Sequence, residues 1–249
     1  MRLKEAAGWN QTEQDWRNVL ELEPEGCFAI EVDGAVQATA TAVCYGTRLA
    51  WIGMVLTHPD YRGRGLARAL MEHAIAWLRA RGVEWIKLDA TDMGRPLYER
   101  LGFVAECAVE RWAATAPGEV AQASACAGSG RTPFDLDLRA FGADRSPLLE
   151  LLERQGYSTG RPGTKAAYFG PCVCPEAAEA RERLCAFLAA RPGERIFWDV
   201  LPHNTAAREL AREFGFAPVR QLVRMTLPGP GAFAHDDNLV YAIAGFEFG

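Results

Sequence analysis

The sequence predicts an α/β protein built on a mixed β-sheet, and three observations predict it. An Asp33-Gly34 pair separates two strand-like stretches, which is the signal of a two-residue β-hairpin. The short apolar stretch LAWIGMVL, residues 49–56, precedes apolar residues at helical spacing, which indicates a buried strand leading into a helix. A similar strand-helix ending then occurs again in the second half of the chain. We therefore expect hairpins followed by βαβ units, with helices on both faces of the sheet.

The individual elements follow from periodicity and turn residues. In the first part, the pattern predicts a helix at residues 12–22, strands at 27–32, 35–45 and 49–55, a helix at 66–81, a strand at 83–90, a helix at 95–101 and a strand at 103–113. In the second part, it predicts a strand-like segment at 166–173, a helix at 177–190, a strand at 196–200, a helix at 205–214 and a final stretch at 216–227.

Composition limits the classes of function. The chain has 249 residues, of which 49% are hydrophobic and 24% are charged, as in an ordinary globular protein with a sizeable core. No run approaches the roughly 20 apolar residues that a membrane helix needs. The N-terminal stretch MRLKEAAGWNQTEQDW lacks the apolar core of a secretory signal, so we expect a cytoplasmic protein. A net charge of −5 argues against a nucleic-acid partner.

The cysteines predict neither a disulfide framework nor a metal site. Seven cysteines are scattered without a CxxC pair, so we expect most of them to be buried thiols. Cys172 and Cys174 are one residue apart, and in a strand their side chains would point to opposite faces. We therefore expect them to share no metal ion.

A repeat organises the chain into two domains. The segments LDATDMGRPLYERLGF and WDVLPHNTAARELAREFGF both end in Gly-Phe, and their alignment places Thr91 on Asn204 and Tyr98 on Ala211. The stretch between the repeats, residues 114–133, is small, polar and turn-prone. The sequence thus predicts one domain at residues 1–113, a linker at 114–133 and a second, related domain at 134–249.

A glycine-rich turn in the first domain predicts an anion site. The segment HPDYRGRGLARAL, residues 58–70, places Gly63 and Gly65 between a strand and a helix. Such a turn directs backbone N–H groups and the positive end of a helix dipole at one point, where a phosphate can bind. A Walker loop would need a Lys after its last glycine, and a dinucleotide fingerprint would need a third glycine where Arg68 stands.

The remaining pattern, Arg62-Gly63-Arg64-Gly65-Leu66-Ala67, follows the form Q/R-x-x-G-x-G/A. With the preceding HPDYRG and the later LYERLGF, it resembles the motifs of the GNAT superfamily, the acetyl-coenzyme A-dependent N-acetyltransferases. The resemblance covers residues 25–112, and a weaker version covers 134–227. It implies a tandem GNAT fold with mixed sheets, and acetyl-CoA as co-substrate.

The resemblance also assigns roles to residues of the first domain. The pyrophosphate would face the backbone N–H groups of Gly63, Arg64, Gly65, Leu66 and Ala67. Arg62, Arg64 and Arg68 would add positive charge. The backbone of Met54 and Leu56, with Val55 between them, would hold the pantetheine and the thioester. Thr91 stands where the family often has an asparagine, which puts one pantetheine contact in doubt. Tyr98 matches the tyrosine that donates a proton to the leaving thiolate, because a phenol is protonated at neutral pH.

The general base and the acceptor contacts stay open at this point. His58 lies beside the turn and titrates in a suitable range, while Glu31, Glu84 and Asp89 on nearby strands are alternatives. Residues near the N-terminus are possible substrate contacts, although packing explains the tryptophans equally well: Trp9, Asn10, Asp15 and Trp16.

The second domain departs from the family pattern. It has no Gly-x-Gly turn and carries Ala211 at the tyrosine position, so we expect it not to bind the cofactor. His203 and Asn204 follow a strand, where α/β folds place ligand contacts, and are candidates for an acceptor-side wall. The function implied is transfer of an acetyl group from acetyl-CoA to a primary amine of a small molecule by direct attack. A non-catalytic acyl-CoA sensor and a protein N-acetyltransferase are the alternatives.

Overall fold

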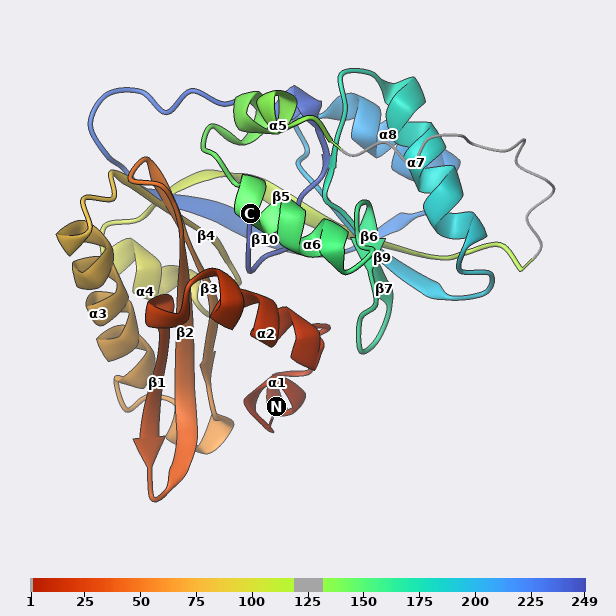
Figure 1. The fold of residues 1–249 in the computed structure, drawn as a ribbon. Coiled ribbons are helices and arrows are strands. Elements are labelled where there is room, and N and C mark those ends of the chain that lie inside the picture. The colour runs from red at the N-terminus through yellow and green to blue at the C-terminus, as the bar shows by residue number, and fades with distance from the viewer. Residues whose placement is uncertain (1, 119–131) are drawn as a thin grey trace. The chain divides into compact units, whose positions relative to one another are not determined.

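The computed structural model describes residues 2–118 and 132–249, and the chain forms two compact units (Figure 1). Unit 1 comprises Met1–Glu106, Val223–Ala232 and Phe246–Gly249, and unit 2 comprises Cys107–Leu222 and Phe233–Gly245. Most of the linker predicted at 114–133, including Cys126, lies outside the described residues. None of the described helices combines the length and the apolar character that crossing a bilayer requires.

Unit 1 contains the elements of the first repeat. They are α1 (Arg2–Ala7), α2 (Glu13–Leu22), β1 (Cys27–Val32), β2 (Ala35–Tyr45), β3 (Leu49–Thr57), α3 (Leu66–Ala80), β4 (Trp85–Ala90) and α4 (Arg95–Arg100), with short 3-10 turns at η1 (Pro24–Gly26) and η2 (Pro59–Tyr61). The strand order is β1-β2-β3-β4-β10, where β10 (Ala217–Leu227) contributes residues 223–227. Strands β3 and β4 are parallel, and the other pairs are antiparallel.

The core of unit 1 lies between α3 and the sheet. Apolar side chains recur on one face of α3 and pack on strands β3 and β4: Met71, Ala74 and Leu78 against Ile52, Ile86 and Leu88. Met225 of β10 belongs to the same core. Unit 1 is therefore completed by a strand from the far end of the sequence.

Buried ion pairs join β10 to the rest of unit 1. Arg224 donates two hydrogen bonds to the Asp89 carboxylate, at 3.0 and 3.2 Å. The Glu106 carboxylate accepts a hydrogen bond from Lys87 at 2.8 Å and another from the Thr226 hydroxyl. Burial by itself raises the pKa of Glu106, but Lys87, Thr226 and Arg224 together hold that pKa below its usual value.

Unit 2 repeats the plan with shorter strands. Its elements are β5 (Val104–Thr115, from residue 107), α5 (Phe134–Phe141), α6 (Ser146–Arg154), β6 (Gly160–Arg161), β7 (Ala167–Phe169), β8 (Cys172–Val173), α7 (Ala177–Ala189), β9 (Arg195–Val200), α8 (Thr205–Glu213), η3 (Asp237–Leu239) and β11 (Val240–Ala242). The strand order is β5-β9-β7-β6, with β11 and β8 forming a separate pair. Helices α7 and α8 pack over Trp198, Phe169 and Phe216.

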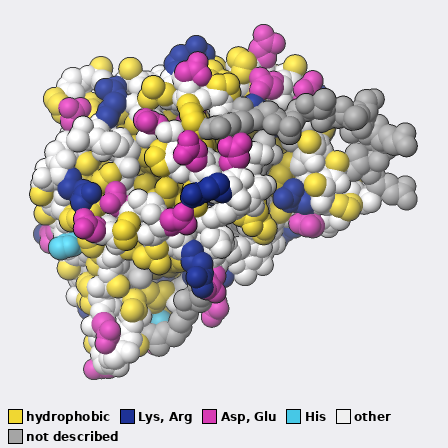
Figure 2. All heavy atoms as spheres, in the orientation of Figure 1, with side chains coloured by type: hydrophobic (Ala, Val, Ile, Leu, Met, Phe, Trp, Pro, Cys, Tyr) yellow, Lys and Arg dark blue, Asp and Glu magenta, His cyan; other side chains and the backbone are white. Residues whose placement is uncertain are grey.

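The α/β class and most predicted elements are confirmed. The helices α1, α5 and α6 and the strands β6 and β11 were not predicted, because each is short or lacks a long apolar period. Acidic and basic side chains are interspersed over the face shown in Figure 2.

The predicted orientation of Cys172 and Cys174, with side chains on opposite faces, is wrong. Their sulfur atoms lie 3.7 Å apart, because β8 ends at Val173 and the backbone no longer alternates its side chains at Cys174. The hydrogen bond with Cys174 and burial raise the pKa of the Cys172 thiol well above its ordinary value. Both thiols are fully buried, and the raised pKa keeps the Cys172 thiol protonated, which makes Cys172 a poor nucleophile.

Candidate functional site

The glycine-rich turn joins β3, through η2, to the start of α3. Gly63 and Gly65 have φ of 73° and 79°, in the left-handed region that glycine adopts without strain. Gly65 is the N-cap of α3 and provides no side-chain cap for the first N–H groups of this helix. A Cβ at either glycine would meet no atom within 4 Å, so the outer side of the turn is open to a ligand.

The residues after Gly65 complete an anion-binding geometry. Leu66 and Ala67 are the first residues of the 15-residue helix α3, whose N-terminal N–H groups have no partner within the helix. The positive end of the helix dipole lies at the same point and favours negative charge there. The predicted cradle residues are therefore adjacent in space at one open helix N-terminus, a geometry suited to an anion.

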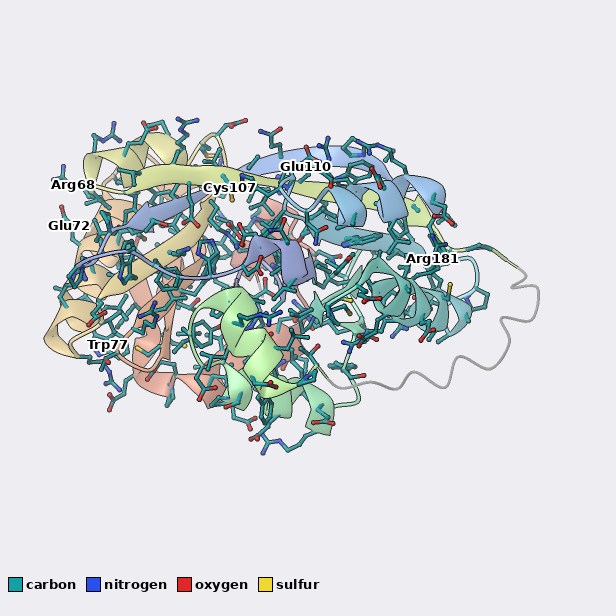
Figure 3. All side chains as sticks on the ribbon, turned by 90° about the horizontal axis from the view of Figure 1, so that it is seen from above. Arg68, Glu72, Trp77, Cys107, Glu110 and Arg181 are labelled. Carbon is teal, nitrogen blue, oxygen red and sulfur yellow. The ribbon has the colours of Figure 1, made fainter. Side chains whose placement is uncertain are left out.

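The arginines of the turn are held by neighbouring groups. Arg62 donates from Nε to the Thr57 carbonyl at 3.4 Å, and Arg64 donates to the Asp60 carbonyl at 3.0 Å. Arg68 donates to the Glu72 carboxylate at 2.8 Å on the exposed side of α3 (Figure 3). Arg62 and Arg64 thus add positive charge at the turn, whereas the charge of Arg68 is balanced by Glu72.

The parallel strands β3 and β4 separate beside this turn. In this fully described part of the chain, they pair only from Leu49 to Trp51 of β3. Met54 has φ of 48°, and the register of β2 against β3 shifts between Thr39 and Thr41, which marks a β-bulge. The bulge reorients the backbone of residues 54–56, where the sequence predicts the pantetheine contacts.

Side chains around the bulge fix its backbone. The Thr39 hydroxyl donates to the Met54 carbonyl at 2.9 Å. Leu56 is opposite Thr39 in the register, and Val55 packs toward Leu70 of α3. The bulge is therefore a built feature of unit 1, and it opens the edge of β3 toward β4.

Tyr98 is the buried residue of α4 and belongs to the core that contains Ile52 of β3 and Leu88 of β4. Its ring packs in the core with Phe103, and a Cβ on Gly94 would lie 3.3 Å from the Tyr98 hydroxyl. Burial raises the pKa of Tyr98 well above its ordinary value, so the phenol keeps its proton. The Thr91 hydroxyl accepts the Gly94 N–H at 3.2 Å, so Thr91 holds the turn that leads into α4.

Comparison with known proteins matches this geometry. Residues 3–103 match the model of the acetyltransferase (GNAT) family, and residues 134–242 match that of an acetyltransferase (GNAT) domain. The chain belongs to the GNAT acetyltransferase family.

Relatives of this GNAT protein match it over most of their own length. The uncharacterized N-acetyltransferase YitH of Bacillus subtilis (strain 168) is 25% identical over 237 residues, 87% of this chain and 83% of that protein. A candidate acetyltransferase from Pyrococcus horikoshii has a TM-score of 0.81 at 22% identity, over 99% of this chain and 90% of its own. A tandem GNAT protein from the clavulanic acid biosynthesis pathway has a TM-score of 0.56 at 16% identity, over 89% and 90% of the two chains. These structures confirm the predicted tandem GNAT fold.

The sequence-derived base candidates are poorly suited to proton transfer. Asp89 is fully buried and occupied by Arg224, and the ring of His58 accepts the Asp60 N–H at 3.4 Å at the start of η2. Glu84 precedes β4, whose register places it at the end of the sheet opposite the turn. Glu31 is exposed on β1.

The structure brings an unpredicted carboxylate to β3. Glu247 is 2% exposed, and its backbone passes so close to Gly53 that a Cβ there would lie 2.8 Å from the Glu247 Cα. Gln11 donates to the Glu247 carboxylate at 2.9 Å. Trp51 donates to the Phe246 carbonyl at 3.0 Å on the same face of β3. No sequence pattern could have indicated Glu247, because it lies 194 positions after Gly53 (247 − 53).

The predicted N-terminal contacts divide between capping and packing. Asp15 is buried in a capping box with Thr12, which makes it a structural residue of α2. Asn10 is buried and Trp9 is half-buried. The indole N–H of Trp16 is buried without a hydrogen-bond partner among the described residues. Trp16 is therefore the residue of this group that keeps a donor for a ligand.

Unit 2 has no comparable anion site in its described residues. Helix α7 begins after Pro175 with Glu176 at its N-cap, which places negative charge where an anion would have to bind. Asn204 is the N-cap of α8 and also donates to the carbonyls of Asn238 and Val240. Its role is structural, whereas His203, beside it, is largely exposed.

Proposed function

We propose that this protein is an acetyl-CoA-dependent N-acetyltransferase that acts on the primary amine of a small molecule by direct attack in a ternary complex. The observation that carries the proposal is the separation of β3 from β4 at Met54, directly before an uncapped, glycine-rich helix start. Family membership supports the same chemistry.

Binding of the cofactor would use two sets of backbone groups. The N–H groups of residues 63–67 would hold the pyrophosphate, with Arg62 and Arg64 adding positive charge. The backbone of residues 54–56 would hold the pantetheine and polarise the thioester carbonyl, and Thr91 would limit the space on the β4 side. We propose these residues as the cofactor site.

Tyr98 would stabilise the leaving thiolate. The sulfur loses its acetyl group to the amine and becomes a thiolate, which needs a proton or a hydrogen bond. Because burial raises the pKa of Tyr98, a free phenolate in this core would be costly. Tyr98 would therefore act through its O–H as a hydrogen-bond donor to the thiolate, and the thiolate would take its proton from solvent, so that no phenolate forms.

Glu247 is our candidate for the group that takes the proton from the amine. Glu247 belongs to the same unit as the bulge, its backbone passes beside Gly53, and its carboxylate accepts a hydrogen bond from Gln11. A carboxylate in this place could also orient a cationic amine before it loses its proton. Glu247 replaces the four base candidates drawn from the sequence.

A small acceptor suits the covered face of β3. The segment Phe246–Gly249 lies against Trp51 and Gly53, and Tyr45 donates to the Phe248 carbonyl at 2.7 Å. A protein substrate needs an open groove or sheet edge for an extended segment. The covered face therefore favours a small amine.

The test is a screen of amines with acetyl-CoA that measures release of free thiol. We expect turnover with at least one small amine, together with calorimetric binding of one acetyl-CoA per chain. Binding of acetyl-CoA without turnover of any amine would favour a sensor, and acetylation of peptides alone would favour a protein acetyltransferase. Two equivalent binding sites per chain would contradict the assignment of the cofactor to unit 1.

A further inference from the structure

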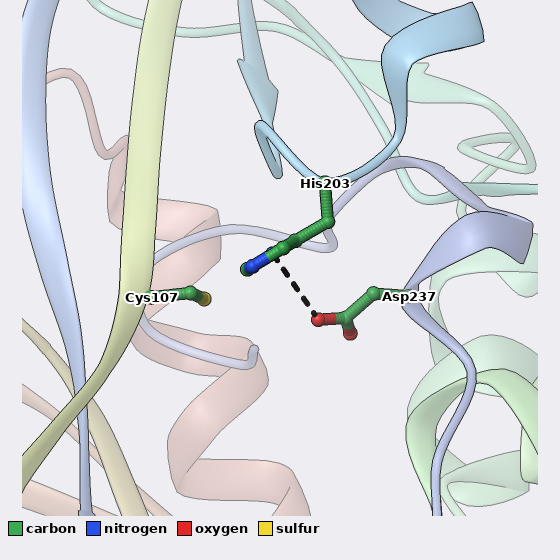
Figure 4. A group of neighbouring side chains, drawn as sticks. All are labelled: Cys107, His203 and Asp237. Atoms are coloured by element: carbon green, nitrogen blue, oxygen red, sulfur yellow. Dashed lines mark ion pairs between the residues drawn. The ribbon is translucent and has the colours of Figure 1, made fainter.

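Three potential metal ligands of different chemistry meet within unit 2, and none of them belongs to the proposed cofactor site. Cys107 comes from β5, His203 from the turn after β9, and Asp237 from η3, and their ligand atoms all lie within 4.8 Å of one another. Figure 4 shows the three side chains directed toward a common point. All three belong to the same compact unit.

The pairing of β5 with β9 explains why Cys107 meets His203. These strands are antiparallel, with Glu110 opposite Val200 and Arg111 opposite Asp199. The same register, continued past the end of β9, places Cys107 opposite His203. The cysteine and the histidine are therefore brought together by the sheet itself.

The third ligand is fixed to the same turn by Asn204. Its side-chain amide donates to the carbonyl of Asn238 at 2.8 Å and to that of Val240 at 3.1 Å. Both residues follow Asp237 closely in the chain, while Asn204 itself follows His203. The positions of His203 and Asp237 are thus preorganised, as a metal site requires.

A second histidine lies beside the Asp237 carboxylate. His235 Nε2 lies 3.5 Å from Asp237 Oδ1, and His235 Nδ1 lies 3.2 Å from the Phe233 carbonyl oxygen. Because a carbonyl oxygen only accepts, Nδ1 is the donor in this contact, and Nε2 is the ring atom that faces Asp237. His235 is therefore within reach of an ion held at Asp237.

The distances fit shared ligation better than a catalytic triad. His203 Nδ1 and Asp237 Oδ2 are 3.9 Å apart, which is too long for the hydrogen bond that orients a catalytic histidine. Two ligands of one tetrahedral zinc ion lie about 3.3–3.7 Å apart, given metal distances of 2.0–2.3 Å. A small rotation of the exposed His203 side chain closes the difference.

We propose that unit 2 binds one Zn²⁺-class divalent ion through Cys107 Sγ, His203 and Asp237, with His235 as fourth ligand or as the hydrogen-bond partner of the carboxylate. Thiolate, imidazole and carboxylate together select a borderline ion such as zinc over Mg²⁺ or Ca²⁺. On binding, the Cys107 thiol releases its proton to the solvent and a sulfur–metal bond forms. The ion ties β5, the β9–α8 turn and η3 together.

The experiment uses the full chain after treatment with a chelator and dialysis. Co²⁺ is added as a spectroscopic probe, and Zn²⁺ binding is followed by calorimetry and by thermal melting. We expect one ion per chain, a thiolate-to-cobalt charge-transfer band, proton release on binding, and a melting temperature that rises with Zn²⁺ concentration.

Variants identify the ligands. Cys107→Ser should abolish the charge-transfer band, and His235→Ala should weaken binding about 10- to 100-fold if the ring supports the carboxylate. Cys185→Ser on α7 and His73→Gln on α3 are matched controls that should bind as the unchanged protein does. A charge-transfer band that persists in Cys107→Ser, or the absence of stoichiometric Zn²⁺ binding by the unchanged protein, would overturn the proposal. Acetyl-CoA binding is measured separately, and its outcome does not depend on this ion.

Discussion

In unit 1 the parallel strands β3 and β4 separate beside a glycine-rich helix start. In unit 2 the corresponding parallel strands are β7 and β9, and residues 241–243 of the same unit form hydrogen bonds with them. Trp198 of β9 donates to the Tyr241 carbonyl at 2.7 Å, and Tyr168 of β7 donates to the Ile243 carbonyl at 3.0 Å. The Ile243 N–H donates to the Asp199 carbonyl at 3.3 Å. Residues 241–243 thus occupy hydrogen-bonding groups of β7 and β9.

The start of the helix that follows the first of these strands also differs between the two units. In unit 1, α3 begins at Gly65 with its first N–H groups accessible, and in unit 2, α7 begins at Glu176. The tyrosine of α4 has its counterpart in Ala211, which is buried in the core of unit 2. The comparison teaches that one fold can either leave its opening for a ligand or close it with backbone, and a few residues decide which.

The largest expected effect tests the open helix start. Gly65→Val should weaken acetyl-CoA binding about 10²- to 10⁴-fold, because its side chain would displace the pyrophosphate from two or more charge-assisted hydrogen bonds of about 1.5–3 kcal/mol each. Gly82→Val, at the other end of α3, is the matched control, since Gly82 has φ of 76° and open space around its Cα. Both variants carry the same backbone strain, and calorimetry should find the affinity unchanged only in the control.

The second prediction tests the strand that unit 1 receives from the far end of the chain. Arg224→Met leaves the Asp89 carboxylate buried without its cation and should lower the free energy of unfolding by about 3–5 kcal/mol. The double variant Arg224→Met/Asp89→Leu should recover much of this loss, because no uncompensated charge remains. Chemical denaturation measures both, and equal stability of Arg224→Met and the unchanged protein would show that β10 is not integral to unit 1.

The third prediction concerns the chemistry that unit 2 lacks. Tyr98→Phe should lower kcat about 10²- to 10⁴-fold with little change in acetyl-CoA affinity, because only the donor hydroxyl is removed from a packed ring. Steady-state kinetics with the amine found in the screen measures the effect. A change in kcat of less than about threefold would mean that Tyr98 only packs the core.

The fourth prediction tests the carboxylate that covers β3. Glu247→Gln keeps the shape of the side chain but removes the base, so kcat should fall by about 100-fold or more while the cofactor still binds. Glu31→Gln, at the exposed carboxylate of β1, is the control and should leave kcat unchanged. If both variants turn over like the unchanged protein, the proton leaves by another route.

The smallest expected effect is on stability at acid pH, and it distinguishes a buried carboxylate from an exposed one. The lowered pKa of Glu106 contributes stability that is present above the ordinary glutamate pKa of about 4.3 and is lost as the pH falls through the lowered value. The hydrogen bond with Arg181 likewise lowers the pKa of Glu213 in unit 2, but this pair is exposed and screened by salt. At high salt, Glu106→Gln should reduce the fall in melting temperature at acid pH, whereas Glu213→Gln should leave that fall unchanged.

Local sequence predicted the features that depend on near neighbours. The strand before the glycine-rich turn, the turn itself and the helix after it lie within residues 49–80, and their patterns follow from burial and from the backbone freedom of glycine. The same holds for Tyr98, five positions before the Gly-Phe ending whose Phe103 it packs against. The tandem repeat was visible because both halves keep this ending.

Tertiary structure decided what depends on pairing between distant segments. The sequence placed a boundary after residue 113, but a cut there would remove Arg224 and Met225, which complete the sheet and core of unit 1. Cys107 and His203 are 96 positions apart (203 − 107) and meet through the antiparallel register of β5 and β9. Glu247 reaches β3 because Gly53 has no Cβ to exclude its backbone. Composition and periodicity carry no record of such pairings, because burial constrains which residues are apolar but not which distant strand they meet.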